Sequence, residues 1–381
     1  MNNNAECVIC ARDMDAGNDS AEHVIPQAIG GRWVVTGFIC RSCNSRAGGS
    51  WDAVLTKQLA WLSTIVGVVR ERGEAPDVAV TTVEGEQLML RSDGAYVFRR
   101  PTIAETADGN TFNISITGRS VAEVRQHLAG FKRRHPEVDI EAAMATITKT
   151  RHYIDNPCQT SLVFGGPEAS ASLIKTALAA AVNFGLTLDA CDVAMTYLRT
   201  FDGPLPVDFF FARDLVKARP DDRILHCVSV RADSASGQAL AYVDYFGLWR
   251  SIVILSRDYT GPAVSKTYAI DPTLGEEVAL EVELDLDEME VASILDGSSG
   301  ALTDWPSVYA RVMPMVLKRA EGRHRERLIE EGVTEAAAAF GLKPGDLIPE
   351  EKQEPFARLA SRLIAEKVVE MTVALERLRS M

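Results

Sequence analysis

The sequence predicts an α+β protein in which a small, cysteine-stapled N-terminal module precedes a larger mixed α/β region with a helical C-terminus. Three observations predict this class. Four of the seven cysteines form two Cys-x-x-Cys pairs near the N-terminus. Strand-like and helix-like segments alternate from about residue 140 onwards. Residues 305–381 carry their apolar side chains mainly at helical spacing.

Length and charge bound the classes of function that the chain can serve. The 381 residues predict two or three domains. The formal net charge of −13 counts against a protein that binds polyanions over its whole surface. It still permits binding through one local strip of basic side chains. Uncharged apolar runs fall short of the about 18 residues that a transmembrane helix needs. Because Met1–Glu6 lacks the basic and apolar regions of a signal peptide, we expect a cytoplasmic protein without a membrane partner.

The two cysteine pairs, Cys7/Cys10 and Cys40/Cys43, predict a metal site. Four thiolates suit tetrahedral Zn²⁺, and a four-cysteine site leaves the ion no open position. We therefore expect a structural zinc that staples a module too small to fold on its own core. The rival interpretation is four unrelated cysteines. The isolated cysteines are expected to be small core residues; they are Cys158, Cys191 and Cys227.

Three further features lie between and just after the cysteine pairs. In chain order they are Glu22-His23-Val24-Ile25-Pro26, Gly30-Gly31 and Asn44. Together with the cysteines, they resemble the HNH, or ββα-metal, endonucleases, and within them the McrA-like group with zinc-binding cysteines. The resemblance covers roughly residues 7–60. It implies a zinc-stapled ββα-metal fold for the N-terminal module and a hydrolase that acts on phosphodiester bonds of nucleic acid.

The resemblance assigns roles to three side chains. His23 matches the general base that takes a proton from the attacking water, and an imidazole titrates near neutral pH. Glu22 matches a ligand of the catalytic metal, and Asn44 matches the final ligand position. A carboxylate and an amide oxygen are hard ligands, which suit Mg²⁺ or Mn²⁺ better than zinc. The expected substrate is double-stranded DNA, cut to leave 5′-phosphate and 3′-hydroxyl ends.

The sequence departs from the family pattern at two positions. The middle asparagine, which orients the base, would fall near Val34–Val35, so another group, such as a backbone carbonyl, must hold His23. Asn44 stands where many members have a histidine, and it is a weaker metal ligand. Asp52 could supply a second carboxylate to the metal; alternatively, it complements a helix dipole. Glu22 and His23 also have a non-catalytic interpretation, as two polar residues of a surface strand.

The N-terminal module is close to neutral. Residues 1–66 contain five Lys or Arg and six Asp or Glu, so much of the substrate binding should come from elsewhere. A helix from about Trp51 presents three leucines at helical spacing, Leu55, Leu59 and Leu62, and should dock on the rest of the chain. Several basic groups could contact phosphate, but each could equally be an ordinary charged side chain on a solvent-exposed surface. These groups are Arg41, Arg46, Lys57, Arg99-Arg100, Lys132 to His135, Lys149/Arg151/His152, and Lys318 to Arg327.

The expected domains are 1–66, the nuclease module; 67–150, a β-rich region with a helix; and 151–381, a mixed α/β region with a helical C-terminal segment. The last region permits a Rossmann-like sensor. The expected elements are short strands over 75–118 with a turn at Ser92-Asp93-Gly94, a helix capped by Ser120, a helix over Ala169–Phe184, strands at 224–230, 238–246 and 250–255, and a half-buried strand over Leu280–Leu286 with an acidic outer face.

We therefore expect a metal-dependent HNH endonuclease, and the resemblance permits a bacterial defence role against phage. Two alternatives stay open. One is an effector that remains silent until a small-molecule activator binds the C-terminal region or a homo-oligomer forms. The other is a zinc-containing nucleic-acid-binding protein that has lost catalysis. The chain has no Gly-x-Gly-x-x-Gly or Walker loop, so no NTP-driven step is expected.

Overall fold

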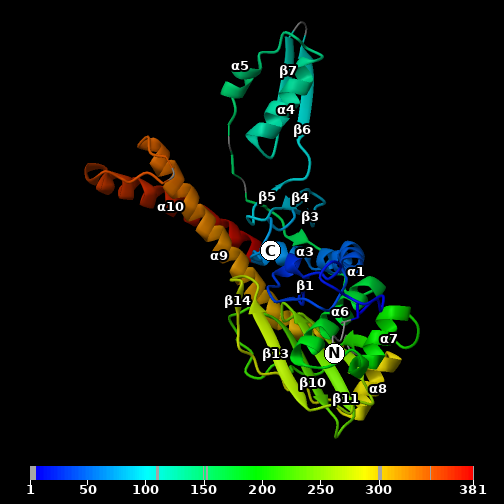
Figure 1. Cartoon of the computed structure of the whole chain (residues 1–381). Coiled ribbons are helices and arrows are strands. Elements are labelled where there is room, and N and C mark those ends of the chain that lie inside the picture. The colour runs from blue at the N-terminus through cyan, green and yellow to red at the C-terminus, as the bar shows by residue number, and fades with distance from the viewer. Residues whose placement is uncertain are drawn as a thin grey trace. The chain divides into compact units, whose positions relative to one another are not determined.

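The computed structural model contains two compact units that interleave along the chain (Figure 1). Unit 1 comprises Met1–Pro76 and Leu162–Ala320, and unit 2 comprises Asp77–Ser161 and Glu321–Met381. The structure describes residues 6–108, 111–148, 150–151, 153–298, 303–343 and 345–380. The α+β class is confirmed. The three consecutive domains remain a prediction, because compactness does not show which segments fold on their own.

A six-stranded sheet forms the scaffold of unit 1. Its order is β14-β13-β10-β11-β12-β9, and every neighbouring pair is antiparallel. The strands are β9 Val207–Phe209, β10 His226–Asp233, β11 Gln238–Tyr245, β12 Trp249–Ser256, β13 Val264–Asp271 and β14 Glu276–Glu277. The three central strands lie where the sequence predicts them. The Rossmann-like alternative is wrong, since that fold requires a mostly parallel sheet.

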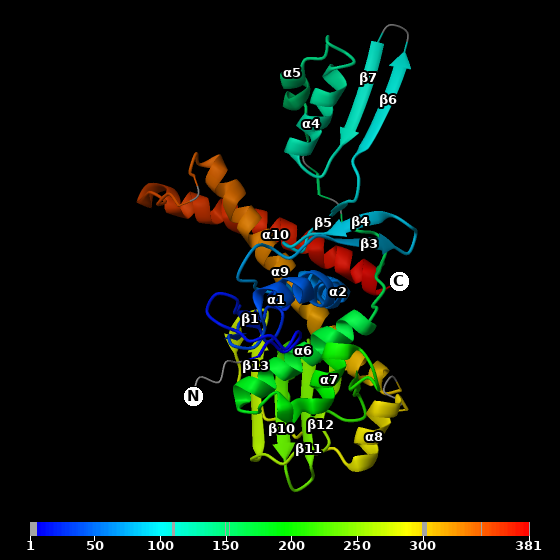
Figure 2. The same cartoon turned by 45° about the vertical axis from the view of Figure 1, so that its right-hand side comes forward.

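Two helices cover one face of this sheet, α6 Pro167–Phe184 and α7 Asp192–Thr200 (Figure 2). The helix α6 begins with proline at its first position and ends at Gly185, whose φ of 111° suits glycine. A 3-10 turn, η3 Asp189–Cys191, leads into α7. Because α6 lies between the sheet and the N-terminal module, it is buried over most of its length.

The other face of the sheet packs on the segment 280–286 and on α8 Glu288–Asp296. Apolar and acidic residues of 280–286 alternate between inside and outside, as the sequence predicts. The segment is not a strand, however. Its backbone hydrogen-bond partners lie in the irregular stretch 215–217, with which it forms the single bridge between Val216 and Val282. This stretch is too short to form a continuous β-ladder with the segment.

The N-terminal module is a short hairpin followed by helices. The strands β1 Glu22–His23 and β2 Val34–Val35 pair antiparallel around η1 Gln27–Ile29. The helical part consists of α1 Arg41–Ala47, the wide turn η2 Gly48–Asp52, α2 Ala53–Gln58 and α3 Ala60–Val66. The predicted docking face is buried, because Leu55, Leu59 and Leu62 are all 0% exposed. Burying one such side chain contributes about 1.5–3 kcal/mol.

Unit 2 combines small sheets with long helices. Its four-stranded sheet has the order β5-β4-β3-β8, and β6 and β7 form a separate hairpin. The predicted cap is confirmed, since Ser120 accepts a hydrogen bond from the backbone N–H of Glu123, and Gly94 turns the chain between β4 and β5. The elements are β3 Val78–Thr82, β4 Gln87–Leu90, β5 Tyr96–Phe98, β6 Thr102–Asp108, β7 Thr111–Thr117, β8 Cys158–Gln159, α4 Val121–Lys132, α5 Ile140–Ala145 and α10 Glu350–Arg379.

The C-terminal segment is helical, as predicted. The helix α9, Trp305–Ala339, begins in unit 1 and ends in unit 2, where it packs on α10. At Gly332 the two helices approach so closely that an added Cβ would lie 2.6 Å from Ile364. Among the described residues, no helix combines the length and apolar character of a membrane span.

Candidate active site

The four paired cysteines form a site that fits zinc. Their sulfur atoms all lie within 4.8 Å of one another, and Cys10 Sγ is 3.8 Å from Cys40 Sγ. A tetrahedral ion with Zn–S bonds of about 2.3 Å has S–S edges of about 3.8 Å. Three of the cysteines are buried, which excludes competing water. Of the isolated cysteines, Cys191 and Cys227 are buried core residues as predicted, whereas Cys158 is half-buried.

The thiol environments differ within the cluster. Burial raises the pKa of Cys43 to about 12. Against the effect of burial, hydrogen bonds led by that of the Ser42 hydroxyl lower the pKa of Cys40 to about 6. The guanidinium of Arg46 also lies 3.8 Å from Cys43 Sγ. Because a cation is needed to hold four thiolates this close, the site suits a tightly bound structural ion.

An arginine from α7 braces the first cysteine pair. Arg199 donates from Nε to the carbonyl of Val8 at 2.9 Å and from Nη2 to the carbonyl of Cys7 at 3.3 Å. These carbonyls belong to the turn between the cysteines, which the Ala11 backbone closes at a φ of 54°. The zinc module is therefore held by a side chain nearly 200 residues further along the chain, which no local pattern indicates.

His23 lies at the end of β1 and contacts a carboxylate that the sequence analysis did not single out. Its Nε2 is 3.1 Å from Glu71 Oε2, and the imidazole is 27% exposed. The hydrogen bond with His23 holds the pKa of Glu71 below its ordinary value, and Arg32 at 3.7 Å adds to the effect. A carboxylate, rather than the suggested backbone carbonyl, is thus the group that contacts the imidazole of His23.

The segment around Glu71 is fixed on the motif. Arg32 donates to the carbonyl of Val69 at 3.2 Å. With the amide oxygen of Gln27 turned toward the chain, that oxygen accepts from the backbone N–H groups of Glu71 at 3.1 Å and Arg72 at 2.8 Å. Glu71 could not be found from the motif, because it follows His23 by 48 residues and comes after the last helix of the module.

Glu22 is buried beside an ammonium group from α6. Lys175 Nζ donates to Glu22 Oε1 and, at 2.8 Å, to Asp52 Oδ2. Lys175 is 2% exposed and Glu22 is 6% exposed. Burial favours the neutral form of both groups, and it raises the pKa of Glu22 against the attraction of Lys175. For Lys175, the two carboxylates outweigh burial and raise the pKa.

Asp52 and Asn44 have different surroundings. Both oxygens of Asp52 accept hydrogen bonds, Oδ1 from Ser172 at 2.6 Å and Oδ2 from Lys175. Asn44, on α1, donates from Nδ2 to Ser20 Oγ at 3.1 Å and to the carbonyl of Ala21 at 3.2 Å. The Asn44 amide nitrogen therefore lies against the residue that directly precedes Glu22, and its side-chain oxygen could serve as a ligand atom.

The donor set fits a hard divalent cation. Mg²⁺ is usually held by one or two carboxylates together with water and substrate phosphate, and Glu22 and Asn44 are side chains of the type that could contribute oxygen donors. Asp52 is engaged with Ser172 and Lys175. Among the His, Cys, Asp and Glu side chains that the structure describes, the four paired cysteines are the group of three or more whose ligand atoms lie close enough together to hold a metal ion.

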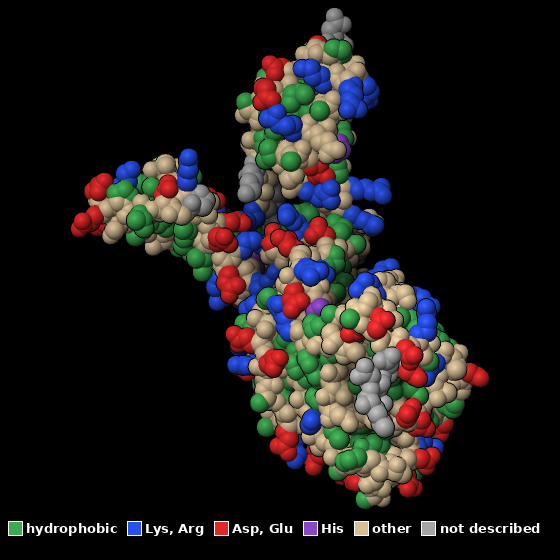
Figure 3. Space-filling view, viewed as in Figure 1, with side chains coloured by type: hydrophobic (Ala, Val, Ile, Leu, Met, Phe, Trp, Pro, Cys, Tyr) green, Lys and Arg blue, Asp and Glu red, His purple; other side chains and the backbone are tan. Residues whose placement is uncertain are grey.

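Basic side chains that could meet phosphate are dispersed. A hollow of about 360 Å³ beside Cys40 is lined by Arg12 and Arg41, among others. On the face drawn in Figure 3, basic and acidic side chains intermingle. Some of the predicted basic residues of unit 2 already have partners within unit 2. Arg151 forms an ion pair with Glu331, and Arg327 donates a hydrogen bond to the carbonyl of Asp93. Lys149 and His152 lie outside the described residues.

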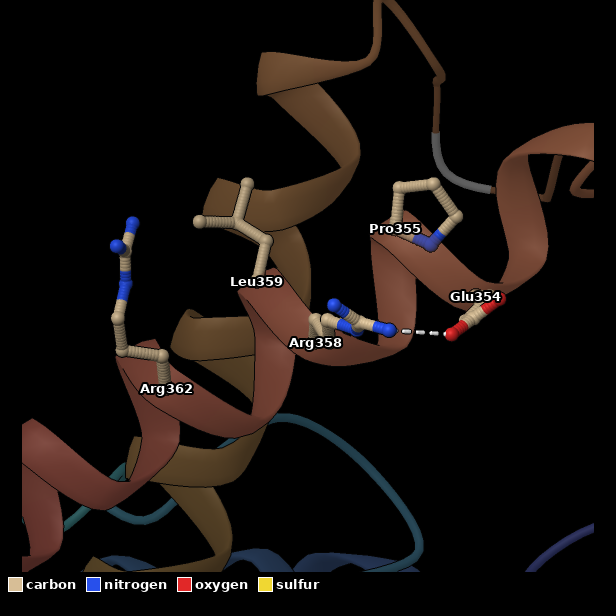
Figure 4. Close-up of a pocket in the computed structure, with 5 residues that line it drawn as sticks. All are labelled: Glu354, Pro355, Arg358, Leu359 and Arg362. Carbon is tan, nitrogen blue, oxygen red and sulfur yellow. Dashed lines mark hydrogen bonds and ion pairs between the residues drawn. The ribbon is translucent and has the colours of Figure 1, made fainter.

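A second hollow lies on α10 in unit 2. It measures about 630 Å³ and is lined by Glu354, Pro355, Arg358, Leu359 and Arg362 (Figure 4). Arg358 pairs with Glu354 along the helix surface, and both side chains are exposed. The hollow contains none of the candidate catalytic residues.

Comparison with known proteins agrees with the geometry of the module. Residues 7–60 match the model of the HNH endonuclease family. The matched HNH module contains both cysteine pairs, Glu22, His23, Asn44 and Asp52, but neither Glu71 nor Lys175. Neither a curated protein nor a solved structure matches the chain. The family match indicates a nuclease, and residues 61–381 lie outside it.

Proposed function

We propose that the protein is a metal-dependent HNH endonuclease that hydrolyses phosphodiester bonds in double-stranded DNA. The observation that carries the proposal is the position of His23, held by Glu71 at 3.1 Å and next in sequence to the buried Glu22, on a module that fits zinc. A general base needs a fixed orientation and a nitrogen that is free to accept a proton. The His23–Glu71 contact supplies the first of these.

The roles of the two nitrogens of His23 follow from this contact. When Nε2–H donates to Glu71, the imidazole is neutral with its lone pair at Nδ1. Nδ1 then takes the proton of the attacking water. A carboxylate partner also stabilises the imidazolium that results, which a backbone carbonyl does less well.

Glu22 and Asn44 would hold the catalytic Mg²⁺ or Mn²⁺. When bound, such an ion neutralises the charge that builds on the scissile phosphate and on the leaving 3′ oxygen. The Asn44 amide is oriented by Ser20 and Ala21, so its oxygen has a fixed direction. The basic hollow beside Cys40 would bind a neighbouring phosphate through Arg12 and Arg41.

A gated form of the same activity is the second candidate. The contacts that support it run from the sheet of unit 1 to the HNH module through α6 and α7. A small-molecule activator or a homo-oligomer that shifts these helices would change the position of Glu22. Such gating would suit a bacterial antiviral effector.

A substrate and metal panel tests the proposal. The purified full chain is incubated with supercoiled plasmid, linear duplex, single-stranded DNA and RNA, each with Mg²⁺, Mn²⁺ or EDTA. We expect duplex DNA to be cut in Mg²⁺ or Mn²⁺, with EDTA abolishing cleavage. Equal cleavage in EDTA would overturn the metal-dependent mechanism, and cleavage of RNA alone would overturn the choice of substrate.

A further inference from the structure

The helix α6 presents three buried polar side chains to the HNH module. Ser172, Lys175 and Thr176 occupy positions i, i+3 and i+4, which share one face of a helix. Their exposed fractions are 0%, 2% and 1%. Thr176 Oγ1 donates to the carbonyl of Val24 at 2.8 Å and lies 3.1 Å from the hydroxyl of Tyr245. The three side chains thus meet the motif at three places.

Lys175 completes a triad of charges with the buried Glu22 and the half-buried Asp52. Two carboxylates face one ammonium, so the triad carries one net negative charge when all three groups are ionised. Buried ion pairs rarely stabilise a protein more than well-packed apolar residues do. A lysine in the middle of an alanine-rich buried helix therefore has a weak structural justification, which favours a role in the chemistry of the site.

The contacts within the triad form a chain from Asp52 through Lys175 to Glu22. Ser172 holds Asp52 Oδ1 at 2.6 Å, and Lys175 Nζ holds Oδ2 at 2.8 Å. The same ammonium takes Glu22 Oε1. With both of its oxygens occupied by side chains of α6, Asp52 orients Lys175, and Lys175 in turn orients Glu22.

We propose that Lys175 is a positioning residue of the nuclease, which fixes one oxygen of Glu22 so that the other is presented to the divalent ion. Asp52 acts through Lys175 and is not a metal ligand. This inference rests on the proposed role of Glu22 as a ligand. It makes α6 a catalytic support as well as a part of the core, so residues outside the family match complete the site.

The test compares four variants of the zinc-loaded full chain: Glu22→Gln, Asp52→Asn, Lys175→Met, and the double variant Asp52→Asn/Lys175→Met. Lys217→Met, which removes an exposed lysine paired with Glu281, is the matched control. Zinc content and thermal unfolding establish the fold. Mn²⁺ titration followed by electron paramagnetic resonance measures affinity, and plasmid cleavage gives kcat and KM.

We expect Lys175→Met to lower kcat about 10–100-fold, the usual effect of losing a group that orients a metal ligand. Asp52→Asn should change Mn²⁺ affinity by less than about threefold while lowering kcat, whereas Glu22→Gln loses Mn²⁺ affinity. The double variant should be no slower than Lys175→Met, because the two residues act in one chain of contacts. Lys175→Arg should restore part of kcat.

Three outcomes would overturn the proposal: an unchanged kcat in Lys175→Met, additive losses in the double variant, or a loss of Mn²⁺ affinity in Asp52→Asn as large as in Glu22→Gln. Should Lys175→Met not fold, Asp52→Asn and the milder Ser172→Ala carry the same comparison. Failure of the nuclease function itself is distinguishable, since the wild type would then not cut and Glu22→Gln would leave Mn²⁺ affinity unchanged.

Discussion

His226 links the sheet of unit 1 to the HNH motif, and its ionisation should make that link sensitive to acid. The imidazole is fully buried; its Nδ1 accepts from the backbone N–H of Phe246 at 2.9 Å, and its Nε2 donates to the carbonyl of Ile29 at 2.8 Å. The contact with Phe246 requires the neutral ring, because a protonated Nδ1 has no lone pair with which to accept a hydrogen bond. Burial lowers the pKa of His226 to about 4, from 6.5 in the unfolded chain.

The sign and size of the effect follow from these two values. A group with a depressed folded pKa contributes stability that is present above the unfolded pKa and is lost as pH falls toward the folded pKa. Between about pH 7.5 and about pH 5.5, linkage for this histidine gives a loss of about 1.4 kcal/mol in the free energy of unfolding. The full loss, reached below about pH 4, would be about 3 kcal/mol.

The assay is urea unfolding of zinc-loaded wild type and His226→Gln at the two pH values. Glutamine retains a donor and an acceptor but does not titrate. We expect the wild type to lose about 1.4 kcal/mol more than the variant over this interval. The matched control is His127→Gln, a half-buried residue on α4 of unit 2, which should follow the wild type. Equal losses in wild type and His226→Gln would refute the reasoning.

Three further predictions concern the module and its supports. Metal analysis should find about one zinc per chain, and Cys40→Ser should lose it and unfold at lower temperature; a variant that keeps both zinc and stability contradicts the four-thiolate site. Glu71→Gln should lower kcat about tenfold with little change in KM, because a neutral amide orients His23 without stabilising its imidazolium, and a kcat equal to that of the wild type would remove Glu71 from the mechanism. Isolated residues 1–66 should fold with zinc but cut poorly, since they lack Glu71, Arg199 and Lys175; full activity of this fragment in the plasmid assay would show that none of these three side chains is needed.

The features that could be predicted from the sequence are those that short spacings encode. Two Cys-x-x-Cys pairs indicate a four-thiolate site because each pair is a local turn. The spacing of Leu55, Leu59 and Leu62 indicates a buried helical face, which the structure contains. The strands β10, β11 and β12 were similarly evident from runs of apolar residues between turns.

The features that could not be predicted depend on contacts between distant parts of the chain. Lys175 follows Glu22 by 153 residues and lies in an alanine-rich helix, whose pattern indicates only burial. Alternation at 280–286 identified the buried side chains correctly but not the secondary structure, since a ladder depends on a partner strand that the segment itself does not specify. The alternation of strands and helices likewise says nothing about whether neighbouring strands run parallel or antiparallel.

The most direct test of the account is a single-turnover cleavage assay of supercoiled plasmid in Mg²⁺ by the zinc-loaded wild type and by His23→Ala, both shown to be free of contaminating nuclease. Removal of a general base typically costs about 10²–10⁴-fold in rate. We predict a loss of this size in His23→Ala, with zinc content and thermal unfolding unchanged, because His23 is not one of the four thiolate ligands. If His23→Ala cuts as fast as the wild type, then His23 is not the base and the mechanism is wrong.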